Sequence, residues 1–201
     1  MIRKGFTLIE LLIVIVVIGI LSAMMYMSSA ESISTANATK IVNDLRMLQT
    51  AAMHWYFDNE ANLVLTDNGY QLKLNEEKIK FHDAILADGI GVKKYISNPN
   101  FALNTGKKDD WQNMYAAVGG YSVYLGFSNT VCYVAYRISG DDKMKDNARL
   151  RDKLKGRAKT AKLVYYNFNG GKEKSKETLY NGENFVCMRV FVLDDKNLKT
   201  K

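Results

Sequence analysis

A carboxylate interrupts the most apolar part of the chain. Glu10 stands among apolar residues, and residues 11–30 that follow it carry no charge. A carboxylate near the middle of a bilayer costs about 2.5 kcal/mol or more, so such a residue usually has a partner and a function. If the chain is cut after Gly5, the new amino group of Phe6 lies one helical turn from Glu10, where the two charges attract strongly in a low dielectric. The alternative is that Glu10 only complements the positive end of a helix dipole.

The two cysteines, Cys132 and Cys187, each fall in the middle of a predicted strand. A bridge between them would close a loop of about 56 residues and contribute about 4 kcal/mol in the chain-entropy model. Matched positions on neighbouring strands can reach bonding distance, and disulfides persist outside the cytoplasm. We therefore predict a Cys132–Cys187 disulfide, with two buried free thiols as the alternative. The spacing fits no zinc motif.

A basic side chain recurs at every fourth position of one segment: Lys145, Arg149, Lys153 and Arg157. On a helix these residues form one ridge, which could contact a polyanion such as nucleic acid. No aromatic residue that could stack on a base lies between Lys143 and Lys162, which argues against that use. We favour a solvated helix face over a polyanion patch.

Metal binding and catalysis have little support. The acidic pairs that begin at Asp109, Asp141 and Asp194 follow no calcium-loop pattern, so we interpret them as surface charge. The two histidines, His54 and His82, belong to no catalytic or metal motif, and the chain has no phosphate loop or nucleophile elbow. We predict no metal, no cofactor and no enzymatic activity.

The element that would position Glu10 is a helix of membrane length. Residues 11–30 rise about 30 Å, the thickness of a bilayer core, and the run is apolar on every side. Arg3 and Lys4 precede it, and the next basic residue is Lys40. The positive-inside rule then predicts a single span with the N-terminus in the cytoplasm and the rest of the chain outside.

This N-terminus has three interpretations: a secretory signal cut after Ala30, an uncleaved anchor, or a processed segment in which the acid has a role. Residues 4–11, Lys-Gly-Phe-Thr-Leu-Ile-Glu-Leu, resemble the class III signal of type IV pilins and type II secretion pseudopilins. The resemblance implies that a prepilin peptidase cuts between Gly5 and Phe6, and that Phe6 is then N-methylated. It also implies that Glu10, with Thr7, serves assembly, with Glu10 pairing to the N-terminus of an adjacent subunit.

Beyond residue 30 the hydrophobic period changes. An apolar stripe on one helix face consists of Ala38, Ile41, Leu45, Leu48, Ala52 and Trp55. No proline or glycine interrupts residues 20–68, so we predict one helix from Phe6 to about Phe57, about 78 Å long. A sheet of the same chain is the partner we favour for the stripe, with a coiled coil as the alternative.

The remaining residues read as an αβ head. Strands are predicted at residues 70–74, 121–127, 130–138, 163–168 and 185–193, with tight turns at 128–129 and 169–171. Helices are predicted at residues 78–87 and 141–155. We expect an α+β fold in which an antiparallel sheet of about four strands lies on the helix stripe. The predicted divisions are a leader at 1–5, a helix at 6–58 with its membrane part at 6–28, and a head at 59–201.

The composition is average for a globular protein. The 201 residues are 47 % hydrophobic and 24 % charged, which excludes disorder and a multi-span membrane protein. The net charge of +7 falls to +5 without the leader, because Arg3 and Lys4 are removed. The resemblance implies a pseudopilin or minor pilin in a homo- or hetero-filament, first in the bacterial cytoplasmic membrane and then in a periplasmic or extracellular filament. It also implies contacts with prepilin peptidase and an inner-membrane assembly platform. The alternatives are a secreted or tethered binding protein and a DNA-uptake pilin.

Overall fold

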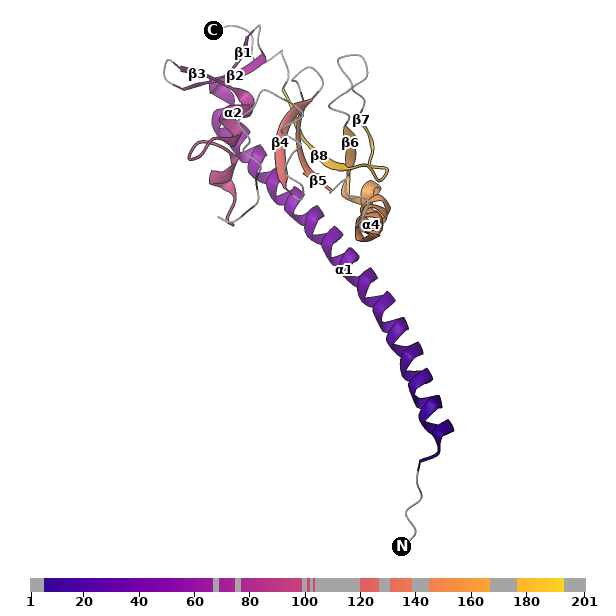
Figure 1. Ribbon diagram of the computed structural model, residues 1–201. Helices are drawn as coiled ribbons and strands as arrows, with labels where there is room; N and C mark the ends of the chain where they lie inside the picture. Colours follow the sequence, from indigo (N-terminus) through magenta and orange to yellow (C-terminus); the bar gives the residue numbers. More distant parts are fainter. Residues whose placement is uncertain are drawn as a thin grey trace.

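The computed structural model consists of one long helix with a mixed αβ head on its C-terminal half (Figure 1). The described residues are 6–66, 69–74, 77–98, 101, 103, 120–126, 131–138, 145–166 and 177–193. The leader at 1–5 and the predicted turns at 128–129 and 169–171 lie outside these residues. The α+β class and the long N-terminal helix are confirmed.

Helix α1 runs without a break from Leu8 to Asn59. Thr7 is its N-cap, so the helix begins two residues after the predicted Phe6 and ends two residues beyond Phe57. The first three turns are built from Leu, Ile and Val around Glu10, and no proline occurs in the helix. Its apolar half projects away from the head, in indigo in Figure 1.

The outer half of α1 buries the predicted stripe. Ala38, Leu45, Leu48, Ala52 and Trp55 have no exposed surface, and Ile41 is 4 % exposed. These side chains share one core with the inner face of the larger sheet, and α1 contacts two strands of that sheet and a second long helix. The expectation that the chain's own sheet covers the stripe is confirmed.

The larger sheet has five strands in the order β4-β5-β8-β6-β7, and its pairings are antiparallel. The strands are β4 (Tyr121–Gly126), β5 (Val131–Arg137), β6 (Val164–Tyr166), β7 (Glu177–Leu179) and β8 (Phe185–Val192). The predicted hairpin of residues 121–138 is confirmed as β4 and β5. The β5–β8 register shifts between Val131 and Tyr133, where a β-bulge interrupts the pairing.

A second sheet lies at the far end of α1, and the sequence did not indicate it. Its order is β1-β2-β3, formed by Leu63–Thr66, Gly69–Leu74 and Glu77–Lys80. The prediction of a single sheet of about four strands was therefore wrong. The predicted strand at 70–74 belongs to this smaller sheet, which packs with α2 (Phe81–Leu86). The predicted helix at 78–87 was correct only in part, because residues 78–80 pair with β2.

The short elements close the core around the end of α1. The 3-10 helices are η1 (Glu60–Asn62) and η2 (Val92–Tyr95). The indole Nε1 of Trp55 donates a hydrogen bond of 2.9 Å to the carbonyl of Ile90, and its ring meets Phe81 edge-on at 5.2 Å. The far end of α1 is therefore held by both polar and aromatic contacts.

Helix α4 runs from Lys145 to Ala161, so it extends six residues beyond the predicted end at 155. Lys162 follows it with φ 54°, and the amide of Leu163 donates to the carbonyl of Ala158 at 2.8 Å. This is a Schellman-type end, which usually has glycine in the left-handed position. A lysine there gives no such signal in the sequence. The predicted start at 141–144 lies outside the described residues.

Candidate functional site

The N-terminus of α1 is organised by Thr7 and Glu10. The Glu10 carboxylate accepts a hydrogen bond of 2.8 Å from the Thr7 amide and one of 2.7 Å from the Thr7 hydroxyl. The Glu10 amide donates to the Thr7 hydroxyl oxygen at 3.3 Å. Together these contacts form a capping box, which satisfies amide groups that a helix start leaves without partners. Glu10 therefore has a structural partner within its own chain.

The first half of α1 is an apolar cylinder. Every described side chain from Phe6 to Ser29 is exposed, and Ser34 is the first of the described side chains along the helix to be buried. By length and composition this helix can cross a membrane. Exposed hydrophobic surface of this extent requires lipid or neighbouring helices around it.

The first charge after the apolar run is Glu31, and it meets the basic ridge. Lys153 Nζ lies 2.7 Å from Glu31 Oε1, and Arg157 Nη1 donates to the Thr39 hydroxyl at 2.7 Å. The hydrogen bond and charge of Lys153 lower the pKa of Glu31. Two of the four predicted ridge residues are therefore used inside the chain. Sequence reasoning missed Glu31, although its place directly after the apolar run was visible.

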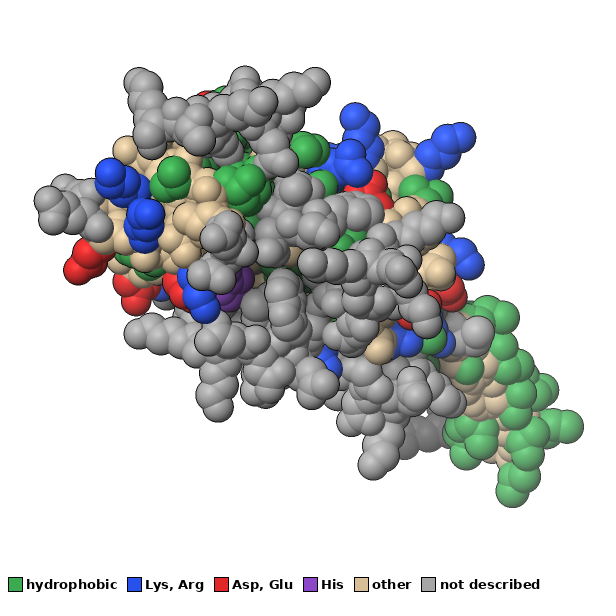
Figure 2. Space-filling model, turned by 90° about the horizontal axis from the view of Figure 1, so that it is seen from above, with side chains coloured by type: hydrophobic (Ala, Val, Ile, Leu, Met, Phe, Trp, Pro, Cys, Tyr) green, Lys and Arg blue, Asp and Glu red, His purple; other side chains and the backbone are tan. Residues whose placement is uncertain are grey.

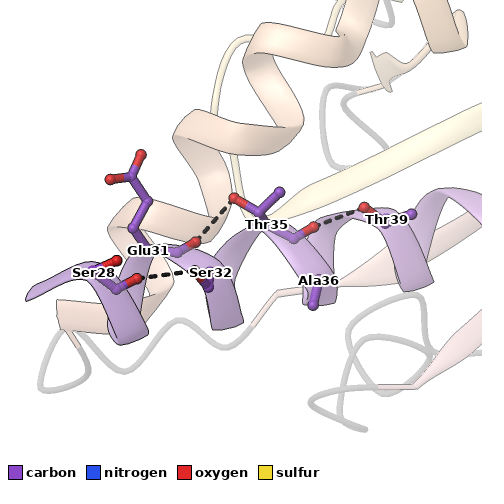
Figure 3. Close-up of a pocket in the computed structure, with 6 residues that line it drawn as sticks. All are labelled: Ser28, Glu31, Ser32, Thr35, Ala36 and Thr39. Atoms are coloured by element: carbon purple, nitrogen blue, oxygen red, sulfur yellow. Dashed lines mark hydrogen bonds between the residues drawn. The ribbon is translucent and has the colours of Figure 1, made fainter. Parts of the chain in front are cut away.

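An open groove runs along α1 beside this ion pair, and Figure 3 shows its lining. It is lined by Ser28, Glu31, Ser32, Thr35, Ala36 and Thr39. Three of its four hydroxyl groups are occupied, because Ser32, Thr35 and Thr39 each donate to the carbonyl four residues earlier. The Glu31 side chain points out of the groove toward α4. The groove is thus a surface of the helix formed mainly by small residues.

The cysteines do not form the predicted disulfide. Both are free and buried, and they face opposite sides of the sheet: Cys132 belongs to the core under α1, and Cys187 to the cluster on the outer face. The register pairs Cys187 with Ala135, three residues from Cys132. An odd offset along a strand reverses the side-chain direction. Burial raises the pKa of the Cys187 thiol to about 12 and that of Cys132 further still.

A second polar cluster, also unexpected from the sequence, lies on the outer face of the sheet. The Tyr133 hydroxyl donates to Glu177 Oε2 at 2.5 Å, and Arg189 donates to the same oxygen at 3.0 and 3.2 Å. Desolvation and the neighbouring Glu177 raise the Tyr133 pKa. The hydrogen bonds among these three side chains connect β5, β7 and β8 and pair their polar groups with one another. We therefore assign this cluster a role in stabilising the sheet.

The other residues weighed for chemistry were the acidic pairs and the two histidines. Within the described part of the chain, no group of three acidic, histidine or cysteine side chains could hold a metal ion. The acidic pairs that begin at residues 109, 141 and 194 lie outside the described part of the chain. The His54 ring stacks on Tyr95 on one side of α1, and His82 Nδ1 lies 3.8 Å from Asp83.

Comparison with known families identifies the N-terminus. Residues 1–26 match the family model described as the prokaryotic N-terminal methylation motif. The chain carries a class III prepilin signal. This signal is that of type IV pilins and pseudopilins, and it coincides with the apolar, exposed half of α1. No curated protein and no solved structure matches the chain. The signal and the apolar helix fit a membrane-anchored structural protein of pilin type.

Proposed function

We propose that this protein is a structural subunit of a type IV pilus or type II secretion pseudopilus, specifically a pseudopilin or minor pilin. The observation that carries the proposal is the methylation motif at residues 1–26, continuous with an exposed apolar helix. Prepilin peptidase cuts between Gly5 and Phe6, and Phe6 is then methylated on its new amino group. An inner-membrane assembly platform adds the subunit to others in a homo- or hetero-filament.

The route begins in the bacterial cytoplasmic membrane. Arg3 and Lys4 retain the N-terminus in the cytoplasm, and the head lies outside. On extraction, the first half of α1 exchanges lipid for neighbouring helices. The head keeps its core, because the stripe from Ala38 to Trp55 is already covered within the chain. The subunit then belongs to a periplasmic or extracellular filament.

Processing is tested by mass spectrometry of the mature N-terminus. The proposal expects a chain that begins at methylated Phe6. A chain that begins at Glu31 would instead indicate a secretory signal, and one that begins at Met1 a plain anchor; either result contradicts the proposal. Gly5→Phe is the matched control, because it blocks the cut while the span of residues 11–30 stays unchanged.

Glu10 has a proposed role in assembly beyond its capping contacts. Its carboxylate already lies within hydrogen-bond distance of the Thr7 amide, next to the residue that becomes the N-terminus. An amino group of an adjacent subunit in the apolar filament core would be neutralised there, and a misregistered subunit would leave the acid without that partner. Thr7 contributes by holding the carboxylate in place.

Glu10→Gln separates pairing from capping, because glutamine can still complete a capping box but carries no charge. We expect normal membrane insertion and at least a tenfold loss of filaments in this variant. Thr7→Ser, which retains the hydroxyl, is the control and should assemble normally. Filaments at the level of the unmodified chain in Glu10→Gln would refute the pairing role.

A further inference from the structure

The position of α4 relative to the membrane follows from one ion pair. Residues 11–30 contain no charge, and a helix of this length spans a bilayer core, so Glu31 lies at the headgroup level. Lys153 Nζ is 2.7 Å from Glu31 Oε1. Helix α4 is thereby held at the same level as the lipid headgroups, 122 residues away from Glu31 in sequence.

The orientation of α4 is set by its apolar side. Leu154 and Ala158 are 0 % and 1 % exposed and belong to the main core. In Figure 1, α4 (orange) lies under the larger sheet, at the end of the head from which the apolar half of α1 emerges. Because α4 packs on α1 as well as under the sheet, the side opposite its buried residues faces obliquely, away from α1 and toward the end of the head from which the apolar half of α1 emerges.

This membrane-facing side is basic. Its exposed cations are Arg149, Lys155 and Lys159, and Asp152 is an exposed acid among them. The charge of Arg149 also acts on Glu31, whose pKa it lowers after the larger effect of Lys153. Lys153 and Arg157 lie at the flank and contact α1, so they do not add to the outward charge. Figure 2, a view from the end of the head opposite the apolar helix, shows separate Lys and Arg side chains along the outline of the head and does not show this side of α4.

We propose that this face of α4, defined by Arg149, Lys155 and Lys159, docks on the anionic phospholipid headgroups of the membrane that α1 spans. The inference rests on the proposed function, because it requires α1 in a bilayer before assembly. Contact with the lipid orients the head against the membrane. The contact is released when the subunit moves into a filament.

The charge pattern favours headgroups over other polyanions. Helix α4 contains no aromatic side chain that could stack on a base. Leu150, Leu154, Ala158 and Ala161 lie in or against the core, and the exposed Ala148 adds little apolar surface, so binding is electrostatic and weakens with salt. A cation near an anionic leaflet changes the ratio of docked to free head about fivefold.

The test uses the full chain with a donor fluorophore on Thr160→Cys, an exposed position of α4. Cys132 and Cys187 have no exposed surface, so only the new thiol is labelled. The chain is reconstituted in vesicles of phosphatidylcholine, alone or with about 30 % phosphatidylglycerol, that contain a headgroup-labelled acceptor. We expect more energy transfer with the anionic lipid, and loss of that increase in about 0.5 M salt.

The triple variant Arg149→Gln/Lys155→Gln/Lys159→Gln should lower the docked-to-free ratio about a hundredfold, since each cation contributes about fivefold. The matched control removes three exposed lysines at the far end of the head, Lys73→Gln/Lys78→Gln/Lys93→Gln, and should keep the increase. The proposal is overturned if energy transfer does not rise with the anionic lipid. It is also overturned if the control variant lowers energy transfer as much as the triple variant does.

Two further readouts separate the alternatives. Flotation with vesicles tests whether the chain is anchored in the bilayer. A chain that floats with neither lipid contradicts the proposed function. A chain that floats but whose α4 fluorophore does not respond to the anionic lipid contradicts only the docking of α4. Duplex DNA is then added to the chain in phosphatidylcholine vesicles. DNA binding that the triple variant abolishes, together with transfer that ignores phosphatidylglycerol, would assign the face to nucleic acid and refute the lipid proposal.

Discussion

Single side chains in this protein are satisfied by partners far away in the chain. Tyr121 donates to Asp44 at 2.6 Å and Tyr95 donates to Asp58 at 2.6 Å, so tyrosine hydroxyls of the head bind carboxylates of α1. Such hydrogen bonds to charged acceptors are stronger than neutral ones. They fasten the polar flank of α1 to the head, beside the apolar stripe.

Two tyrosines that donate to carboxylates, Tyr56 and Tyr95, should make the stability of the fold decrease at alkaline pH. Desolvation and a neighbouring carboxylate raise the pKa of Tyr56 and of Tyr95 to about 12. A folded-state pKa above the unfolded value contributes stability that is complete below about pH 10 and is lost as the pH rises toward about 12. The thermal midpoint, measured by circular dichroism in detergent, should therefore fall steadily across this interval.

Tyr95→Phe is the informative variant for this effect. It removes one titrating hydroxyl, so its thermal midpoint should start lower, because the bond to Asp58 is lost, and then fall less steeply with pH. Parallel slopes for the variant and the unmodified chain would contradict the assignment of the alkaline effect to Tyr95.

The two thiols should behave as core residues. Because burial raises their pKa and removes access, we expect no reaction of Cys132 or Cys187 with a disulfide reagent at about pH 8 in the folded chain. Both should react after denaturation. A protein that yields no thiol after denaturation without reductant would show that the cysteines are oxidised.

At the scale of elements, α1 has two surroundings along its length. Its first half is exposed throughout, and its second half buries a continuous stripe against β5, β8 and α4. The β-bulge in the β5–β8 pairing presents both Val190 and Phe191 of β8 to this core. The Phe191 ring stacks on Tyr56 of α1 at 4.3 Å, so the irregular pairing is used for packing.

Leu48→Ala tests the stripe. Leu48 has no exposed surface, and truncation of a fully buried leucine costs about 2–5 kcal/mol through lost transfer energy and a residual cavity. Chemical denaturation followed by circular dichroism in detergent measures this loss. Ile33→Ala on the same helix is the control: Ile33 is 60 % exposed, so its truncation should change the unfolding free energy by about 0.5 kcal/mol or less. Equal losses would show that the stripe does not carry the packing.

At the scale of the whole molecule, the head and the outer half of α1 are one folding unit. The core joins residues from Ala38 to Leu193 and takes side chains from both sheets, α2 and α4. Among the side chains that the structure describes, the apolar half of α1 contributes none to this core. The described core of the head therefore does not depend on packing by the apolar half of α1.

A chain that lacks residues 1–27 should consequently be soluble and fold. Its thermal midpoint should lie within about 2 °C of that of the full chain in detergent, a shift equivalent to less than about 1 kcal/mol. A chain that begins at residue 50 loses Ala38, Leu45 and Leu48 from the core and should not fold, because these losses approach the whole stability of a domain. Folding of this shorter chain would contradict the single-unit description.

The predictions from the sequence succeeded where a local pattern was sufficient and failed where pairing across the chain decided. The stripe on α1 and the hairpin of residues 121–138 follow helical and strand periods, and both were confirmed. The disulfide was wrong because the β5–β8 register places Cys187 opposite Ala135. The predicted end of α4 was wrong because Lys162 occupies the left-handed position that ends the helix. A glycine at this position would have signalled the helix end in the sequence, whereas a lysine does not.

By itself the sequence determined the N-terminal signal and the two halves of α1, because consecutive residues carry both the motif and the change of hydrophobic period. Only the tertiary structure decided that the strands pair into two separate sheets over one core and that the cysteines face opposite sides of the larger sheet. It also brought Lys153 to Glu31, which places a basic helix beside the membrane segment. These features depend on strand register and on contacts between segments that are distant in sequence. Both are determined by the free energy of the whole fold and not by any one stretch of residues.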